Sequence, residues 1–119
     1  TVVLAMLESL KSMHRHEIRK AMEYTKNHYM KPIRLKDVAS LVHLSENYFS
    51  YVFTNETGKT YSQYLTEIRI AKAKELLARN ECSWVEAGER VGFDNPKYFT
   101  KVFKKSVGVT PKQYADARK

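Results

Sequence analysis

The sequence contains a single cysteine and no apolar run that approaches the roughly 20 residues needed to cross a bilayer. Cys82 cannot form an intramolecular disulfide, which is typical of a reducing cytosol, so we expect a cytoplasmic protein with no membrane partner. The sequence also has no glycine-rich phosphate loop and no cluster of His, Cys and Asp at metal-ligand or catalytic spacing. We therefore expect a protein that is not an enzyme and has no metal site and no cofactor.

Acidic residues are fewer than basic ones. The 119-residue chain has 13 Asp and Glu against 21 Lys and Arg, which gives a formal net charge of +8 and a pI of about 9.6. This balance favours a polyanion as partner. A hydrophobic content of 43% with 12% aromatic residues is enough for a core and excludes wholesale disorder. The length fits one compact domain, or two small lobes that share a central element.

Glycine and proline are sparse, and both are absent from residues 60–79, TYSQYLTEIRIAKAKELLAR. This composition predicts a continuous helix of roughly 30 Å that begins with a capping box between Thr60 and Gln63. Apolar residues recur every three to four positions, so we expect one buried stripe. Its members are Tyr61, Tyr64, Leu65, Ile68, Ala71, Leu76 and Leu77.

Similar sequence flanks this segment on both sides, at residues 35–64 and 84–114. The matches include an apolar series, a Tyr-Phe pair, a glycine and a Thr-x-x-Gln-Tyr ending, with one inserted residue in the second copy. They indicate one structural unit used twice. The matched residues are Leu35, Val38, Ala39, Val42, Leu44, Tyr48, Phe49, Phe53, Gly58, Thr60, Gln63 and Tyr64 with Trp84, Ala87, Gly88, Val91, Phe93, Tyr98, Phe99, Phe103, Gly108, Thr110, Gln113 and Tyr114.

Each copy has the helix-turn-helix pattern of two helices across a short turn. The first copy predicts helices at 35–42 and 46–57, with Ser45 as N-cap and Gly58 as the end. The second predicts a helix from Trp84 to about residue 91, a helix at 96–107 capped by Asn95, and a last helix at 111–117. Ser83 and Glu86 predict a capping box. We expect an apolar inner face on each second helix, from Tyr48, Phe49, Val52 and Phe53 in the first copy and Phe99 and Phe103 in the second.

The part before the first copy predicts an amphipathic helix at 14–29, which ends at Lys31-Pro32. We interpret residues 1–15 as a linker helix or a frayed tail, and as a possible homodimer contact. The domain boundaries are then 1–15 for this segment, 16–59 for the first subdomain, 60–79 for the central helix and 80–119 for the second subdomain. His14 and His16 are two residues apart, so they are expected on the surface and not as a metal pair.

The phrases VGF...YFTKVFKKSVGVTPKQY and IRIAKAKELL resemble the DNA-binding domain of the AraC/XylS family of bacterial transcription regulators, over roughly residues 16–117. The resemblance implies an all-α fold of about seven helices, in which two homeodomain-like helix-turn-helix subdomains are joined by the long central helix. It implies double-stranded DNA and RNA polymerase as partners. The phrase LSENYFSYVF with a linker helix is similar to output domains of two-component response regulators. A ligand-responsive AraC-type regulator and a basic helical protein-interaction module are the alternatives.

The resemblance also assigns base reading to one face of the second helix in each helix-turn-helix, the recognition helix. The implied base contacts are Asn47, Ser50 and Tyr51 in the first helix and Lys97, Thr100 and Lys101 in the second. Ser45 and Asn95, with free amides at each helix N-terminus, are candidate phosphate contacts, as are Lys104 and Lys105. Residues 45–58 contain no Lys or Arg, so we expect the second subdomain to supply more of the affinity and the first to supply selectivity.

Two features of the central helix bear on how these faces are used. Half-sites of helix-turn-helix dimers lie about 34 Å apart, close to the length of this helix. A monomer is therefore expected to reach successive major grooves, and an asymmetric target follows because the two copies differ. Arg69 in this helix is expected to form an internal salt bridge and not to read a base.

Overall fold

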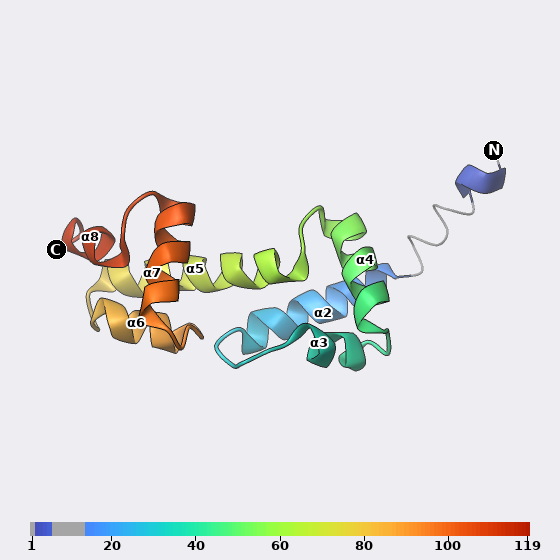
Figure 1. The fold of residues 1–119 in the computed structure, drawn as a ribbon, viewed down its shortest axis with the longest axis horizontal. Helices are drawn as coiled ribbons and strands as arrows, with labels where there is room; N and C mark the ends of the chain where they lie inside the picture. The colour runs from blue at the N-terminus through green and yellow to red at the C-terminus, as the bar shows by residue number, and fades with distance from the viewer. Residues whose placement is uncertain (1, 6–13) are drawn as a thin grey trace. The chain divides into compact units, whose positions relative to one another are not determined.

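The structure is a computed structural model that describes residues 2–5 and 14–119 (Figure 1). Within these residues all regular secondary structure is helical, as predicted. Residues 2–5 are helical, and the rest of the predicted linker segment before residue 14 lies outside the described residues. The other helices are α2 (Arg15–His28), α3 (Leu35–Leu41), α4 (Glu46–Thr57), α5 (Tyr61–Arg79), α6 (Trp84–Arg90), α7 (Pro96–Val107) and α8 (Pro111–Asp116).

The chain divides into two compact units. Unit 1 comprises residues 1–28 and 33–65, and unit 2 comprises residues 29–32 and 66–119. The division falls inside α5, so the helix that the sequence analysis set apart as a separate segment contributes to both units. Each unit contains a helix-turn-helix, formed by α3 and α4 in unit 1 and by α6 and α7 in unit 2.

Unit 1 is built from α2, α3 and α4, which contact one another, together with the first turns of α5 (Figure 1). Thr25 is fully buried, and its hydroxyl is hydrogen-bonded to the Ala21 carbonyl at 2.7 Å and to the Tyr61 hydroxyl at 2.8 Å, so its polarity is satisfied. Burial raises the pKa of the Tyr64 hydroxyl, and Tyr61 and Glu23 add to the shift. The buried residues are Ile18, Ala21, Thr25, Val38, Ala39, Val42, Phe49, Val52, Phe53, Tyr61, Tyr64 and Leu65.

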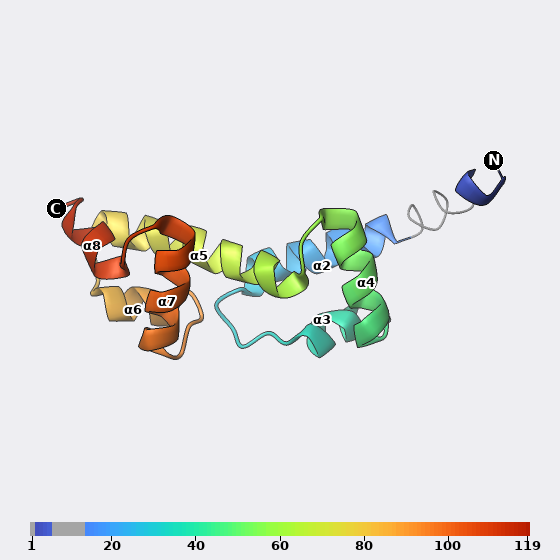
Figure 2. The ribbon, with the colours of Figure 1, turned by 45° about the horizontal axis from the view of Figure 1, so that its top comes forward.

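Unit 2 is built from the remainder of α5 together with α6, α7 and α8, and the last three helices contact one another (Figure 2). The buried residues of α5 here follow the same three-then-four spacing as those of α2, so the repeat extends to the first helix of each unit. They are Ile70, Ala73 and Leu77 in α5 and Ile18, Ala21 and Thr25 in α2. Trp84 is partly buried against a core that also contains Ala87, Val91, Phe93, Phe99 and Phe103.

The buried face of α5 differs from the single stripe that the sequence predicted. Ala71 is exposed and Ile68 is only partly buried, whereas Ile70 and Ala73 are buried. The step from Leu65 to Ile70 is five residues, which breaks the helical spacing of one stripe. The cause is that the start of α5 packs into the core of unit 1 and the remainder into the core of unit 2.

The two helix-turn-helix turns have the same backbone hydrogen bonds. The Leu44 N–H donates to the Ala39 carbonyl and the Phe93 N–H donates to the Gly88 carbonyl, each at 2.9 Å. The residue at the crossing is alanine in unit 1 and glycine in unit 2. A Cβ at Gly88 would lie 2.5 Å from Cδ2 of the fully buried Phe99 ring, so the close approach of α7 to α6 requires glycine there.

The turn residues themselves are His43 and Gly92, which both have positive φ, at 59° and 108°. Histidine tolerates this conformation at a modest cost. Gly92 cannot be replaced so easily, because a Cβ there would lie 2.8 Å from both Arg69 Nε and the Tyr29 carbonyl oxygen. The backbone of the second turn therefore lies directly against the Arg69 side chain of α5 and the Tyr29 carbonyl that follows α2.

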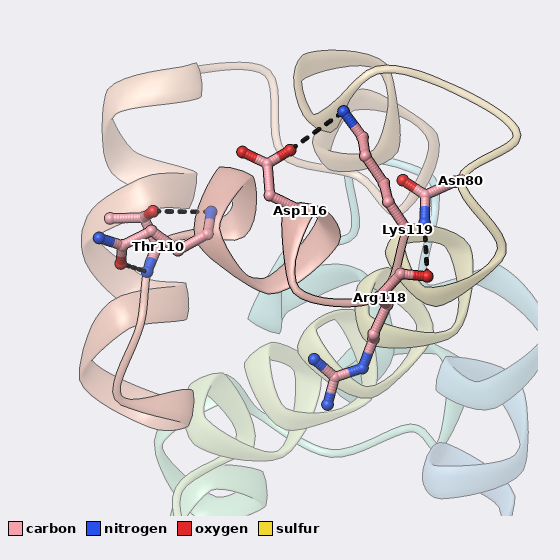
Figure 3. Close-up of polar contacts among 6 residues, drawn as sticks. Asn80, Thr110, Asp116, Arg118 and Lys119 are labelled. Atoms are coloured by element: carbon pink, nitrogen blue, oxygen red, sulfur yellow. Dashed lines mark hydrogen bonds and ion pairs between the residues drawn. The ribbon is translucent and has the colours of Figure 1, made fainter.

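Capping interactions fix the ends of α5 and α8 in the same way. In each, the threonine hydroxyl accepts the glutamine N–H at 3.1 Å and the glutamine side-chain oxygen accepts the threonine N–H at 3.0 Å. The pairs are Thr60 with Gln63 in α5 and Thr110 with Gln113 in α8, and Figure 3 shows the second. At α6 the Ser83 hydroxyl accepts the Glu86 N–H, as predicted. The Glu86 carboxylate, however, lies 3.7 Å from Arg90, one turn on.

The C-terminal residues are held against unit 2 (Figure 3). The Asn80 side-chain amide donates to the Arg118 carbonyl at 3.5 Å, and Lys119 pairs with Asp116 at 3.2 Å. The Arg118 guanidinium lies over the Tyr114 ring, 3.5 Å from its centroid. The Asn80 contact joins the end of the chain to the junction between α5 and α6, and the other two lie within the C-terminal segment.

Candidate nucleic-acid interface

In unit 1 the sequence of α4 separates a buried face from an outward one. Ser45 begins the helix, where its hydroxyl accepts the Tyr48 N–H at 3.2 Å. Phe49, Val52 and Phe53 point into the core. The predicted base contacts lie away from that face, with Asn47 exposed, Tyr51 65% exposed and Ser50 partly exposed. Their spacing of three and four residues puts all three on one surface.

In unit 2 the helix α7 has the same division. Phe99 and Phe103 are fully buried. The outward residues are Lys97 and Lys101, which are exposed, and Thr100, which is partly exposed. The Thr100 hydroxyl donates to the Pro96 carbonyl at 2.9 Å, so its oxygen is left to act as an acceptor. Lys104 and Lys105 are also exposed and continue the basic surface along the last turn.

The prediction that Tyr48 points inward was wrong. Tyr48 is 42% exposed and Tyr98, its counterpart in α7, is 50% exposed. Each residue directly precedes a buried phenylalanine, and one step of 100° places its side chain at the boundary of the buried face. The signal in the sequence was tyrosine in place of phenylalanine at both positions, because a phenol hydroxyl favours a site with one end in water.

The expectation of free amides at each helix N-terminus fails for α7. Asn95 Oδ1 accepts the N–H groups of Lys97 at 2.9 Å and Tyr98 at 3.2 Å. The Phe99 N–H donates to the Asn95 carbonyl, and Pro96 has no N–H. Of the terminal amide positions of α7, Pro96 has no N–H and those of Lys97 and Tyr98 are paired, so the predicted phosphate contact of Asn95 depends mainly on its side-chain NH₂ group.

At α4 the N-terminus is different. Ser45 accepts the Tyr48 N–H through its hydroxyl and the Phe49 N–H through its carbonyl. The Phe49 bond is the first one within the helix, so the amides of Glu46 and Asn47 are among those that a helix leaves without intrahelical partners. The exposed Ser45 hydroxyl and these amides keep the predicted phosphate contact of Ser45 geometrically open.

Charge is divided unequally between the units. Unit 1 has eight basic and six acidic residues, a net of +2, whereas unit 2 has thirteen and seven, a net of +6. α4 carries Glu46 and Glu56 and no basic residue, and α7 carries four lysines and no acidic residue. The attraction toward a polyanion is therefore concentrated in unit 2.

Arg69, which was predicted to form an internal salt bridge, donates to two main-chain carbonyls within unit 2 and acts as a clamp. Its Nε donates to the Tyr29 carbonyl at 2.8 Å and its terminal nitrogen donates to the Lys31 carbonyl at 2.9 Å. The guanidinium also lies 5.8 Å from the centroid of the Phe93 ring. Both hydrogen-bond partners are carbonyls nearly 40 residues away in sequence, which no local pattern indicates.

Within residues 2–5 and 14–119, no group of three or more His, Cys, Asp or Glu side chains is placed to hold a metal ion. None of the helices in that part of the chain is both long and apolar enough to cross a membrane.

Residues 38–117 match the family of the helix-turn-helix domain of AraC type. The chain is 36% identical over 101 residues to the regulatory protein PocR of Salmonella typhimurium. The matched region covers 85% of this chain and 33% of PocR. It spans between 21% and 57% of the length of three curated relatives.

Two solved structures are similar to this one. The C-terminal domain of AraT, a response regulator from Geobacillus stearothermophilus, is 38% identical with a TM-score of 0.81 over 86% of this chain and 85% of that one. The DNA-binding domain of AdpA in complex with a target DNA has a TM-score of 0.80 over 84% and 90% of the two chains, and at 24% identity it shows the fold alone. The chain belongs to the AraC-type family of helix-turn-helix DNA-binding domains that regulate transcription.

Proposed function

We propose that this chain binds one asymmetric DNA site through α4 and α7, which enter successive major grooves, and that it is the output domain of a two-component response regulator. The observation that carries the first part is that both recognition helices expose the residues assigned to base reading, opposite a phenylalanine core. The response-regulator context is supported by the likeness to AraT, which is described as a response regulator. We further propose RNA polymerase as a partner, a cytoplasmic location, and homodimer contacts through the N-terminal segment or through a further domain.

The chemistry of the two faces predicts different kinds of contact. Asn47 can pair with N6 and N7 of adenine, and Ser50 and Tyr51 discriminate less. Lys97 and Lys101 can donate to O6 and N7 of guanine or to phosphate. Unit 2 thus supplies most of the affinity, and unit 1 refines the choice of sequence.

The continuity of α5 supports the use of both helices on one duplex. A helix of 19 residues is about 28 Å long, which is comparable with the roughly 34 Å between half-sites one turn apart. Because α4 and α7 differ at every base-reading position, the two half-sites are expected to differ as well.

Selection from a random duplex pool tests the proposal. The expected product is one site with two unlike conserved segments about 10 base pairs apart. A single conserved segment would mean that one helix reads alone. No enrichment at any salt concentration would instead favour a basic helical module that binds proteins.

A further inference from the structure

The first residues of α2 and the residue before it contact both ends of the first recognition helix. His14 Nε2 is 2.8 Å from the Tyr48 hydroxyl, and the two rings meet edge to face with centroids 5.1 Å apart. Arg15 Nε is 3.7 Å from a carboxylate oxygen of Glu56, whose side chain is only 16% exposed. Tyr48 is in the first turn of α4 and Glu56 is in its last turn. Two neighbouring residues therefore hold a helix of 12 residues at both ends.

Unit 2 is built differently at this point. When the buried residues of α5 are aligned with those of α2, Thr66 stands where unit 1 has His14. Tyr98 matches Tyr48, but its ring meets Phe93 edge to face within its own helix-turn-helix, with centroids 6.1 Å apart. The link from the preceding chain to a recognition helix is thus a property of unit 1.

The position of Tyr48 connects this link to DNA reading. Tyr48 follows Asn47 directly and precedes Ser50 and Tyr51, so a rotation of α4 that moves the phenol moves all three predicted base contacts. The buried residues of α4 set its overall orientation, and contacts at both ends restrict its remaining tilt and rotation more than a contact at one end would.

We propose that His14 is a positioning residue for base reading by α4, and that with Arg15 it holds the first recognition helix in its reading orientation. The proposal rests on the proposed function, since it takes α4 to be a DNA reader. Loss of the His14 contact then affects the half-site read by α4 and leaves the half-site read by α7 unchanged.

Glutamine at position 14 should restore the hydrogen bond to Tyr48 that alanine removes. The hydroxyl donates to Nε2 of one imidazole tautomer, or Nε2–H of the other donates to the hydroxyl. A glutamine side chain places an amide close to the position of Nε2 and can do either, whereas alanine can do neither. The contact is on the surface, so its loss is expected to weaken binding by about two- to tenfold, the range for one hydrogen bond.

The test uses the 119-residue chain on its selected duplex, with variants His14→Ala, His14→Gln, Tyr48→Phe and the double variant His14→Ala/Tyr48→Phe. Tyr98→Phe is the matched control in α7. Affinity is measured by fluorescence anisotropy at one salt concentration, and protection of each half-site by hydroxyl-radical footprinting. Backbone amide shifts of Asn47 and Tyr51 are recorded without DNA, so that a change in α4 is seen independently of binding.

The expected result is weaker protection of the α4 half-site in His14→Ala and Tyr48→Phe, restored in His14→Gln, with the double variant no weaker than either single one. The α7 half-site stays protected, and Tyr98→Phe has no effect on the α4 half-site. Unchanged α4 amide shifts and unchanged protection in His14→Ala would overturn this proposal while the proposed function stands. A parent chain that binds no duplex would overturn both.

Discussion

Replacement of Arg69 by methionine should destabilise unit 2 without removing a DNA contact. Methionine keeps the apolar stem of the side chain but loses the donors to the Tyr29 and Lys31 carbonyls and the position over Phe93. Hydrogen bonds from a charged donor contribute about 1.5–3 kcal/mol each, and the low end applies because Arg69 is only partly buried. The interaction with the ring adds about 0.5 kcal/mol. We therefore expect a loss of about 3.5 kcal/mol in the free energy of unfolding.

The assay is urea and thermal unfolding followed by circular dichroism. For a chain of 119 residues that unfolds as one unit, 1 kcal/mol corresponds to about 4 °C, so Tm should fall by about 14 °C. Arg69→Lys keeps the charge but cannot bridge two carbonyls, and it should recover less than half of the loss. Arg79→Met, at the exposed last residue of α5, is the control and should change stability by less than about 0.5 kcal/mol.

DNA affinity distinguishes the clamp from a base reader. Well below its Tm, the Arg69→Met variant should bind the selected duplex with the affinity and salt dependence of the parent. If Arg69→Met has the same Tm as the parent but loses affinity for one particular base pair, Arg69 reads DNA and is not a structural clamp.

Three further sets of substitutions test the structure and DNA binding of the two units. Gly92→Ala should cost more than about 2 kcal/mol in urea unfolding, whereas Gly108→Ala, with a similar positive φ but open space at its Cβ, should cost about 1 kcal/mol; equal costs would contradict the predicted clash. Lys101→Ala should weaken binding at one salt concentration more than Asn47→Ala and lower the salt slope by about 1, and equal losses would disprove the unequal division of affinity. Tyr51→Arg adds a cation to a helix that has none and should raise both affinity and salt slope; unchanged values would place that face of α4 away from the duplex.

Much of the fold could be predicted because its signals are local. Ser45 and Asn95 mark helix starts, Gly58 and Gly108 mark helix ends in the left-handed conformation, and each cap was found where the sequence placed it. The internal repeat then predicted two helix-turn-helix units, and their turns have matching hydrogen bonds. The prediction succeeded because each local preference agrees with the tertiary fold.

The parts that could not be predicted depend on contacts between distant residues. The buried face of α5 changes along its length because two separate cores use it, and periodicity alone reports a single stripe. The partner of Tyr48 is His14, 34 residues earlier, and a helix phase cannot reveal such a pairing. The occupied amides of α7 are a different case, because Asn95 followed by Pro96 already indicated an N-terminus with its donors taken.

The central claim is that α4 and α7 read one duplex in successive major grooves. Its most direct test is the affinity of the chain for the selected duplex after five base pairs are inserted between the two half-sites. Half a turn of rotation should remove one reader, so binding should fall to that of a duplex with a single half-site, and the footprint should shrink to one segment. An affinity and a footprint unchanged by the insertion would contradict the claim.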